Sequence, residues 1–117
     1  MAGFAQDGTF RIDDVPPGTM VRVEVGGHPV CLANVDGTLH AIHDTCTHGM
    51  ASLSAGWFDP DMCRVECPRH GAYFRLTDGA ALTPPATASV PVFPVEVRDG
   101  RVLIGTEPNI PHPFDTP

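Results

Sequence analysis

Tight-turn signals recur along the whole chain, and they restrict its fold more than any other feature. Each signal is an aspartate or glycine followed by glycine, a pair that accepts the positive φ angles of two-residue hairpin turns. The pairs are Asp7-Gly8, Gly26-Gly27, Asp36-Gly37, Asp78-Gly79 and Asp99-Gly100. Between them, no segment of ten or more residues has the periodicity of a helix. We therefore expect an all-β protein.

The segments between the turns alternate with the period of two that is typical of strands. Val21, Val23 and Val25 share one face of such a segment, while Arg22 and Glu24 take the other. By this pattern we predict strands at 9–12, 20–25, 28–35, 38–43, 62–66, 72–76, 92–98 and 101–105. Many short strands favour a small antiparallel sandwich or barrel.

Two stretches lack this alternation and are predicted to be long loops. Residues 44–60 are rich in Thr, Gly, Ser and Ala, and residues 77–91 include Pro84, Pro85 and Pro91. Long loops in a small protein often carry function. The proline-rich tail, 108–117, is expected to be extended or weakly ordered. Because nothing marks an internal boundary, we treat residues 1–117 as a single domain.

Composition excludes several classes of partner. The chain of 117 residues has seven basic residues against 14 acidic ones, a formal charge of −7. Binding to phosphate groups requires a basic surface, so we expect neither nucleic acid nor a membrane as a partner. No apolar run is long enough to span a bilayer, and the start of the chain lacks the features of a signal peptide. We expect a cytoplasmic protein whose thiols stay reduced.

Two Cys/His pairs form the strongest chemical signal. They are Cys46-Thr47-His48 and Cys67-Pro68-Arg69-His70, each at the point where a predicted strand gives way to a loop. Two thiolates and two imidazoles can hold either a tetrahedral zinc ion or a mixed-ligand iron–sulfur cluster. Structural zinc sites usually pair Cys with Cys and His with His. One Cys with one His in each half therefore favours a two-iron cluster, with zinc as the alternative.

Residues near these pairs are given simpler roles. Cys31 and Cys63 are predicted to be buried thiols rather than a disulfide, because cysteine is among the most buried residue types. We expect Gly49 and Gly71 to keep the two loops thin. We predict that Trp57 and Phe58 pack under the cluster loops and that Tyr73 is also a packing residue. The acidic residues are expected to form mainly a solvated face, and the alternative is that some of them, such as Asp44, Asp59 or Asp61, steer a partner. Ordinary structural positions are predicted for His28, His40, His43 and His112.

The two halves together resemble the Rieske signature C-x-H … C-x-x-H. The resemblance runs from about Phe10 to Ile104 and is strongest at residues 46–49, 56–58, 65–71 and 92–95. These segments are similar to the free Rieske ferredoxins of bacterial aromatic-ring dioxygenase systems. The resemblance implies one [2Fe–2S] cluster per chain, with one iron on Cys46 and Cys67 and the other on His48 and His70.

It also implies an antiparallel Rieske-type sandwich with a small cluster-binding subdomain, at approximately 43–75, and a proline-bearing cover loop near 82–86. The protein would be a monomeric one-electron carrier rather than an enzyme. It would take electrons from an NAD(P)H-dependent flavoprotein reductase and pass them to a terminal aromatic-ring-hydroxylating oxygenase. The alternatives are the small subunit of an assimilatory nitrite reductase, a structural zinc-binding module and a redox sensor.

The resemblance further predicts a low-potential cluster. High-potential respiratory Rieske proteins carry Ser and Tyr, which can donate to the cluster, where this chain has Ala72 and Phe74. Those proteins also join their two cluster loops by a disulfide. Here the matching positions are Ala51 and Arg69, so that bridge cannot form.

Overall fold

The protein is described by a computed structural model over residues 11–115; residues 1–10 and 116–117 lie outside the described range. The described chain is all-β, as predicted, and its sheets are antiparallel. A four-stranded sheet has the order β1 (Met20–Val25), β2 (His28–Val35), β3 (Thr38–His43) and β7 (Val92–Phe93). A three-stranded sheet consists of β4 (Trp57–Asp59), β5 (Arg64–Glu66) and β6 (Tyr73–Arg75). A two-stranded ribbon pairs β8 (Val95–Arg98) with β9 (Arg101–Ile104).

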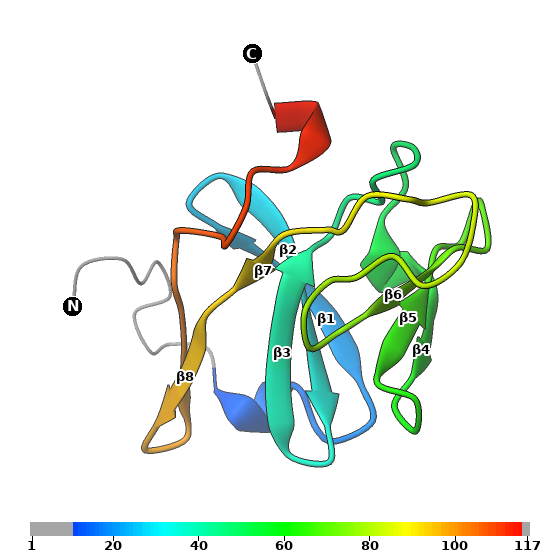
Figure 1. The fold of residues 1–117 in the computed structure, drawn as a ribbon. Coiled ribbons are helices and arrows are strands. Elements are labelled where there is room, and N and C mark those ends of the chain that lie inside the picture. The colour runs from blue at the N-terminus through cyan, green and yellow to red at the C-terminus, as the bar shows by residue number, and fades with distance from the viewer. Residues whose placement is uncertain (1–10, 116–117) are drawn as a thin grey trace.

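The four-stranded sheet lies between the other two units, with the ribbon on one side and the three-stranded sheet on the other (Figure 1). Helical structure among the described residues is confined to three short 3-10 turns, η1 (Ile12–Asp14), η2 (Leu53–Ala55) and η3 (Pro113–Asp115). None of these turns has the length or the apolar character needed to traverse a bilayer.

The predicted turn signals set the register of the hairpins. Asp36 and Gly37 have φ angles of 52° and 93°, and this left-handed pair joins Val35 to its partner Thr38. Gly26-Gly27 and Asp99-Gly100 close the β1–β2 and β8–β9 hairpins in the same way. The Asp7-Gly8 signal lies outside the described residues, as does the first half of the predicted strand 9–12. Of the second half, Arg11 is extended and forms an isolated antiparallel bridge with Arg101, whereas the prediction is wrong for Ile12, which begins η1.

Three other predictions need correction. The prediction of a loop over 44–60 is wrong at its end, where β4 lies. A strand of three residues is too short to show the alternation by which strands are recognised in a sequence. The predicted strand 92–98 is split at Pro94, since proline has no amide hydrogen to donate to a sheet. The predicted strand 62–66 begins only at Arg64, because Cys63 has a φ of 53° and belongs to a turn.

Apolar residues on the two faces of β2 enter two different cores. Val30 and Leu32 pack with Val102 and Ile104 of the ribbon. Cys31 and Ala33 instead join a second core beneath the three-stranded sheet, which contains Ile42, Leu53, Val65 and Phe74. Cys46 and Cys67 belong to this second core, so the predicted metal ligands are attached to a packed framework. Cys31 and Cys63 are free thiols, as predicted, but only Cys31 is fully buried, because Cys63 lies in a turn and is half-buried.

Candidate metal centre

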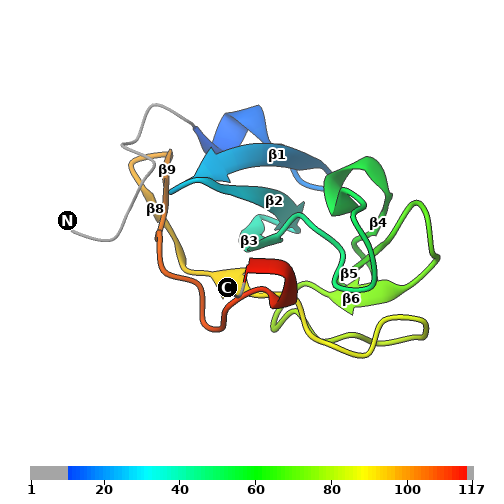
Figure 2. The same cartoon turned by 90° about the horizontal axis from the view of Figure 1, so that it is seen from above.

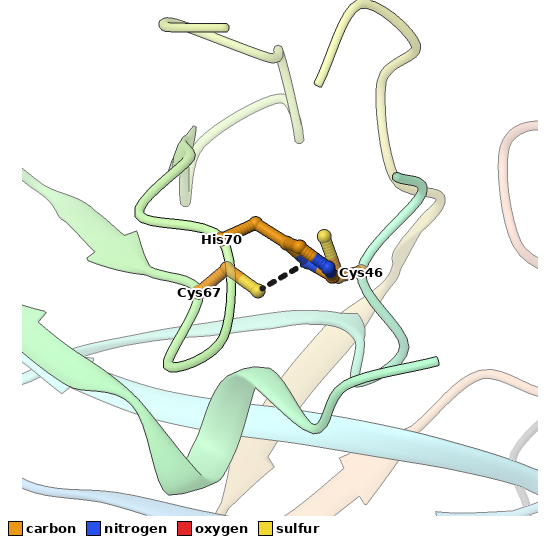
Figure 3. Close-up of side chains that lie close together, drawn as sticks. All are labelled: Cys46, Cys67 and His70. Carbon is orange, nitrogen blue, oxygen red and sulfur yellow. Dashed lines mark hydrogen bonds between the residues drawn. The ribbon is translucent and has the colours of Figure 1, made fainter. Parts of the chain in front are cut away.

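Two loops bring sulfur and nitrogen donors together at one end of the second core. The first loop, 44–52, follows β3, and the second loop, 67–72, joins β5 to β6. The sulfur atoms of Cys46 and Cys67 and a ring nitrogen of His70 all lie within 4.8 Å of one another (Figure 3). Cys67 Sγ is 3.6 Å from His70 Nδ1. Both cysteines are completely buried and neither forms a disulfide.

The fourth predicted ligand, His48, lies beside this group rather than in it. Its ring meets the His70 ring edge-on, with 4.5 Å between ring centroids and 84° between planes. His48 is exposed and His70 is half-buried, whereas the two thiols are enclosed. The structure therefore gathers all four predicted residues, with sulfur on the inside and imidazole toward solvent.

The conformation of the second loop is set by backbone hydrogen bonds between its own residues. The Cys67 amide donates to the Ala72 carbonyl oxygen at 2.8 Å, and the Gly71 amide donates to the Cys67 carbonyl oxygen at 3.1 Å. Gly71 has a φ of +71°, a left-handed conformation that other residues rarely adopt. These contacts close a tight turn that holds Cys67 and His70 on the same side.

The first loop has a matching backbone bond, from the Cys46 amide to the Ala51 carbonyl oxygen at 2.9 Å, and is further organised by a buried carboxylate. Asp44 is only 2% exposed. It accepts hydrogen bonds from the Ser52 hydroxyl and, at 2.7 Å, from the Ser54 amide, and its other neighbour is the Arg22 guanidinium at 3.8 Å. The expectation of a solvated position for Asp44 and the alternative that it steers a partner are therefore both wrong, because its side chain points inward and shapes the loop. No local sequence signal distinguishes this role from that of a surface aspartate.

Gly49 provides the space in which the two loops meet. A Cβ atom at this position would lie 2.6 Å from Cε1 of His70, well inside van der Waals contact. This close approach confirms the expectation that Gly49 keeps the site thin. At Gly71 an added Cβ would meet only Glu66, at 3.6 Å, so that glycine is required by its backbone angle and not by crowding.

A third segment, the predicted loop 77–91, contacts the first loop. The Thr47 hydroxyl donates to the Ala88 carbonyl oxygen at 2.6 Å, and Ala86 is buried in the same core as the two cysteines. On the outer face of the three-stranded sheet, by contrast, Trp57 is 64% exposed. The prediction that Trp57 packs under the loops is wrong, and its neighbour Phe58 does the packing.

The electrostatics of the thiols fit a bound cation. Burial is the main cause that raises the pKa of Cys46, and the adjacent Cys67 raises it further, while the amides of His48 and Gly49 lower it by donating to the sulfur. Two thiolates side by side in an enclosed space are costly without a positive counter-charge. Iron ions supply that charge, so two buried sulfurs with two outer imidazoles suit a mixed-ligand [2Fe–2S] cluster.

Comparison with known proteins gives a consistent family. The Rieske [2Fe-2S] domain matches residues 9–94. Ferredoxin CarAc of Metapseudomonas resinovorans is 43% identical over 95 residues, which cover 80% of this chain and 87% of that protein. The 3-phenylpropionate/cinnamic acid dioxygenase ferredoxin subunit of Escherichia coli (strain K12) is 42% identical over 93 residues, covering 80% and 86%.

Similarity to solved structures supports the same family. A chain in the complex of reduced oxygenase and oxidized ferredoxin in carbazole 1,9a-dioxygenase has a TM-score of 0.82 and 37% identity, covering 92% of this chain and 98% of its own length. A putative NADH-dependent nitrite reductase small subunit from Mycobacterium tuberculosis is more distant, with a TM-score of 0.73 and 27% identity over 92% and 97% of the two chains. The cofactor is therefore an iron–sulfur cluster and not zinc, and the chain belongs to the Rieske [2Fe-2S] domain family.

Proposed function

We propose that this protein is a Rieske-type ferredoxin that carries single electrons from an NAD(P)H-dependent flavoprotein reductase to a terminal aromatic-ring-hydroxylating oxygenase. The observation that carries the proposal is the layering of the site, with thiols enclosed and the imidazoles of His48 and His70 toward solvent. The curated relatives, which are ferredoxin components of dioxygenase systems, support the same assignment.

In this proposal Cys46 and Cys67 bind one iron, and His48 and His70 bind the other, within a cluster-binding subdomain at approximately 43–75. The bound cluster supplies reversible one-electron chemistry. The protein holds the sulfur side of the cluster inside a packed core and leaves the imidazole side near the surface. The outer rings would then give the shortest path to a docked partner.

The proposed potential is low for a Rieske centre. Replacing two of four thiolates by neutral imidazoles makes a cluster easier to reduce, which gives Rieske centres potentials of about −150 to +300 mV against about −400 mV for plant-type ferredoxins. Hydroxyl donors would raise the potential further, but Ala72 and Phe74 are fully buried and carry none. The buried Asp44 carboxylate adds negative charge close to the site, which disfavours an extra electron.

Docking would use the tip of the two loops. Met50, next to the His48–Gly49 pair, is 73% exposed, and Arg69 is exposed beside His70. Electron-transfer contacts are typically small, below about 1,200 Å². Because the chain carries a net charge of −7, a basic docking face on the partner would speed encounter at low salt. We place the protein in the cytoplasm, where four cysteines that form no disulfide and an NAD(P)H-dependent donor are compatible.

Reconstitution tests this function. The purified protein would be combined with NADH, a flavoprotein ferredoxin reductase and a terminal ring-hydroxylating oxygenase, and oxygen uptake would be measured with the aromatic substrate present. We expect uptake to rise with the concentration of this chain, and a redox titration to show one electron per chain near the negative end of the Rieske range. Failure to accept an electron, or activity only with a nitrite reductase, would contradict the proposal.

A further inference from the structure

The chain beyond residue 94 is not part of the family match, yet its last described segment folds back over the four-stranded sheet (Figures 1 and 2) and contacts the first metal loop at Thr45. After β9 the segment 109–114, which we name the C-terminal strap, lies against the four-stranded sheet. The Asn109 amide donates to the Val92 carbonyl oxygen at 3.0 Å, and the Val92 amide donates to Asn109 Oδ1 at 2.8 Å. This reciprocal pair fixes the start of the strap to β7, at the edge of the four-stranded sheet.

His112 then joins the strap to the first metal loop. Its side chain is only 1% exposed, although it lies in a proline-rich tail. Nε2 is 2.8 Å from the Thr45 carbonyl oxygen, and Nδ1 is 3.0 Å from the Phe114 amide nitrogen. A carbonyl oxygen can only accept and an amide can only donate, so Nε2 carries the ring proton and donates it to Thr45.

The other backbone group of Thr45 is also held by an imidazole. Its amide donates to Nδ1 of His43 at 3.1 Å, and the His43 and His112 rings pack with centroids 4.3 Å apart. Two packed imidazoles, one from β3 and one from the strap, therefore fix the amide and the carbonyl of a single residue. That residue directly precedes Cys46.

We propose that His112 is a positioning residue for the iron–sulfur cluster: by donating to the Thr45 carbonyl, it makes the C-terminal strap hold Cys46 in place. This inference rests on the proposed function, since it takes Cys46 to be a ligand. Without the donor, the peptide between Thr45 and Cys46 keeps the hydrogen bond from the Cys46 amide to the Ala51 carbonyl oxygen, at 2.9 Å, but loses the restraint on its carbonyl side, so the sulfur is held less firmly. The bound cluster would then be released more readily, and its spectrum would change.

The test compares three variants of the full chain after anaerobic loading with iron and sulfide. His112→Phe keeps a ring in the same space but removes the donor, and His112→Gln offers an amide hydrogen in its place. His40→Phe, at the half-buried far end of β3, is the matched control. For each, we would measure the rate at which visible absorbance is lost in excess chelator, the EPR spectrum of the reduced protein and the thermal midpoint.

Loss of a donor from a partly buried carbonyl predicts bleaching roughly tenfold faster in His112→Phe, with a shifted or broadened EPR spectrum. His112→Gln should recover most of the wild-type rate and spectrum, and His40→Phe should match the wild type in both. Should His112→Phe not fold, Asn109→Ala would detach the strap at its other anchor, and we expect faster bleaching there as well.

Two results would overturn the positioning role. One is a His112→Phe protein, or in its absence an Asn109→Ala protein, with the wild-type rate and spectrum. The other is faster bleaching that simply follows a lower thermal midpoint, with an unchanged spectrum and no recovery in His112→Gln. A wild-type protein without a Rieske spectrum would instead overturn both this inference and the proposed function.

Discussion

The two metal loops present the same pair of residue types but are constructed differently. The second loop closes on itself, through backbone hydrogen bonds from Cys67 to Ala72 and from Gly71 to Cys67. The first loop has a backbone hydrogen bond of the same kind, from the Cys46 amide to the Ala51 carbonyl oxygen, but side chains hold it as well. The Asp44 carboxylate holds residues 52–54, and His112 holds Thr45 across a sequence distance of 67 residues. The second loop is thus closed by its own backbone, whereas the first loop combines a local backbone bond with side-chain contacts, one of which comes from a segment distant in sequence.

This difference predicts which substitutions act on the cluster alone and which act through the fold. A change inside the second loop should have local effects on its backbone angle or its ligands. A change around the first loop should affect both the stability of the protein and the retention of the cluster.

The largest effect is expected where the two loops are equivalent, at their cysteines. Cys46→Ser and Cys67→Ser should each abolish the visible absorbance of the loaded protein, because each removes a thiolate that iron requires. Cys63→Ser is the control, since Cys63 lies in the turn before β5, and it should remain coloured. Iron and sulfide content measured after desalting would check the result, and a fully loaded Cys46→Ser protein would break the equivalence of the loops.

The next effect separates the loops through their glycines. Gly49→Ala would place a Cβ 2.6 Å from the His70 ring, and a ring held by iron cannot move aside, so we expect most of the cluster to be lost. Gly71→Ala meets no such obstacle and should cost about 1–2 kcal/mol of unfolding free energy through its left-handed φ, with the cluster retained. Cluster content and denaturant unfolding, measured on both variants, distinguish the two outcomes. Equal loss of cluster in both would contradict this contrast.

A smaller effect is expected from the carboxylate that frames the first loop. Asp44→Asn keeps the shape of the side chain but exchanges an accepting oxygen for a donating amide, opposite the Ser52 hydroxyl and the Ser54 amide. We expect a loss of about 1–3 kcal/mol of unfolding free energy, together with a more positive cluster potential because a buried negative charge is gone. Denaturant unfolding and redox titration measure the two quantities. The matched control is Asp78→Asn, an exposed carboxylate, and a similar change in both variants would mean that Asp44 has no special role.

The smallest effect concerns that exposed carboxylate itself. Arg75 donates to both oxygens of Asp78, at 2.9 and 2.7 Å, and these hydrogen bonds are the main cause that lowers the pKa of Asp78 from 3.8 to about 2. Because the pKa is lower in the folded state, the pair contributes stability above the ordinary pKa and loses it as the pH falls toward 2. The difference in unfolding free energy between wild type and Asp78→Asn should therefore be constant above about pH 5 and should narrow below about pH 4. A difference that grows on acidification would contradict the assignment.

Features encoded by neighbouring residues were predictable from the sequence. The Asp-Gly and Gly-Gly pairs predicted the hairpins because positive φ is a property of those residues themselves. The Cys/His spacing likewise predicts that the four side chains gather at one place, because each Cys and its His are separated by only one or two residues of the same loop. Strand β4 was missed because its three residues are defined by pairing with β5 and not by a pattern of their own.

The framework around the donors was not predictable in this way. The sequence favours a surface position for Asp44 and an ordinary tail position for His112. The structure differs because Asp44 is buried by a loop that folds back on it through Ser54, 10 residues on, and because the partner of His112 lies 67 residues away. A lone aspartate or histidine carries no local mark of such a partner. Trp57 was assigned to the interior on its apolar character alone, yet its place on the outer face follows from the pairing of β4.

Mixed ligation by two cysteines and two histidines is tested most directly by the EPR spectrum of the dithionite-reduced protein. We predict a Rieske spectrum, whose average g value is lower than that of clusters held by four cysteines, with a signal that corresponds to one cluster per chain. An average g value typical of all-cysteine clusters would remove His48 and His70 from the site. An iron-free, colourless protein after anaerobic production with ample iron and sulfide would contradict the presence of the cluster altogether.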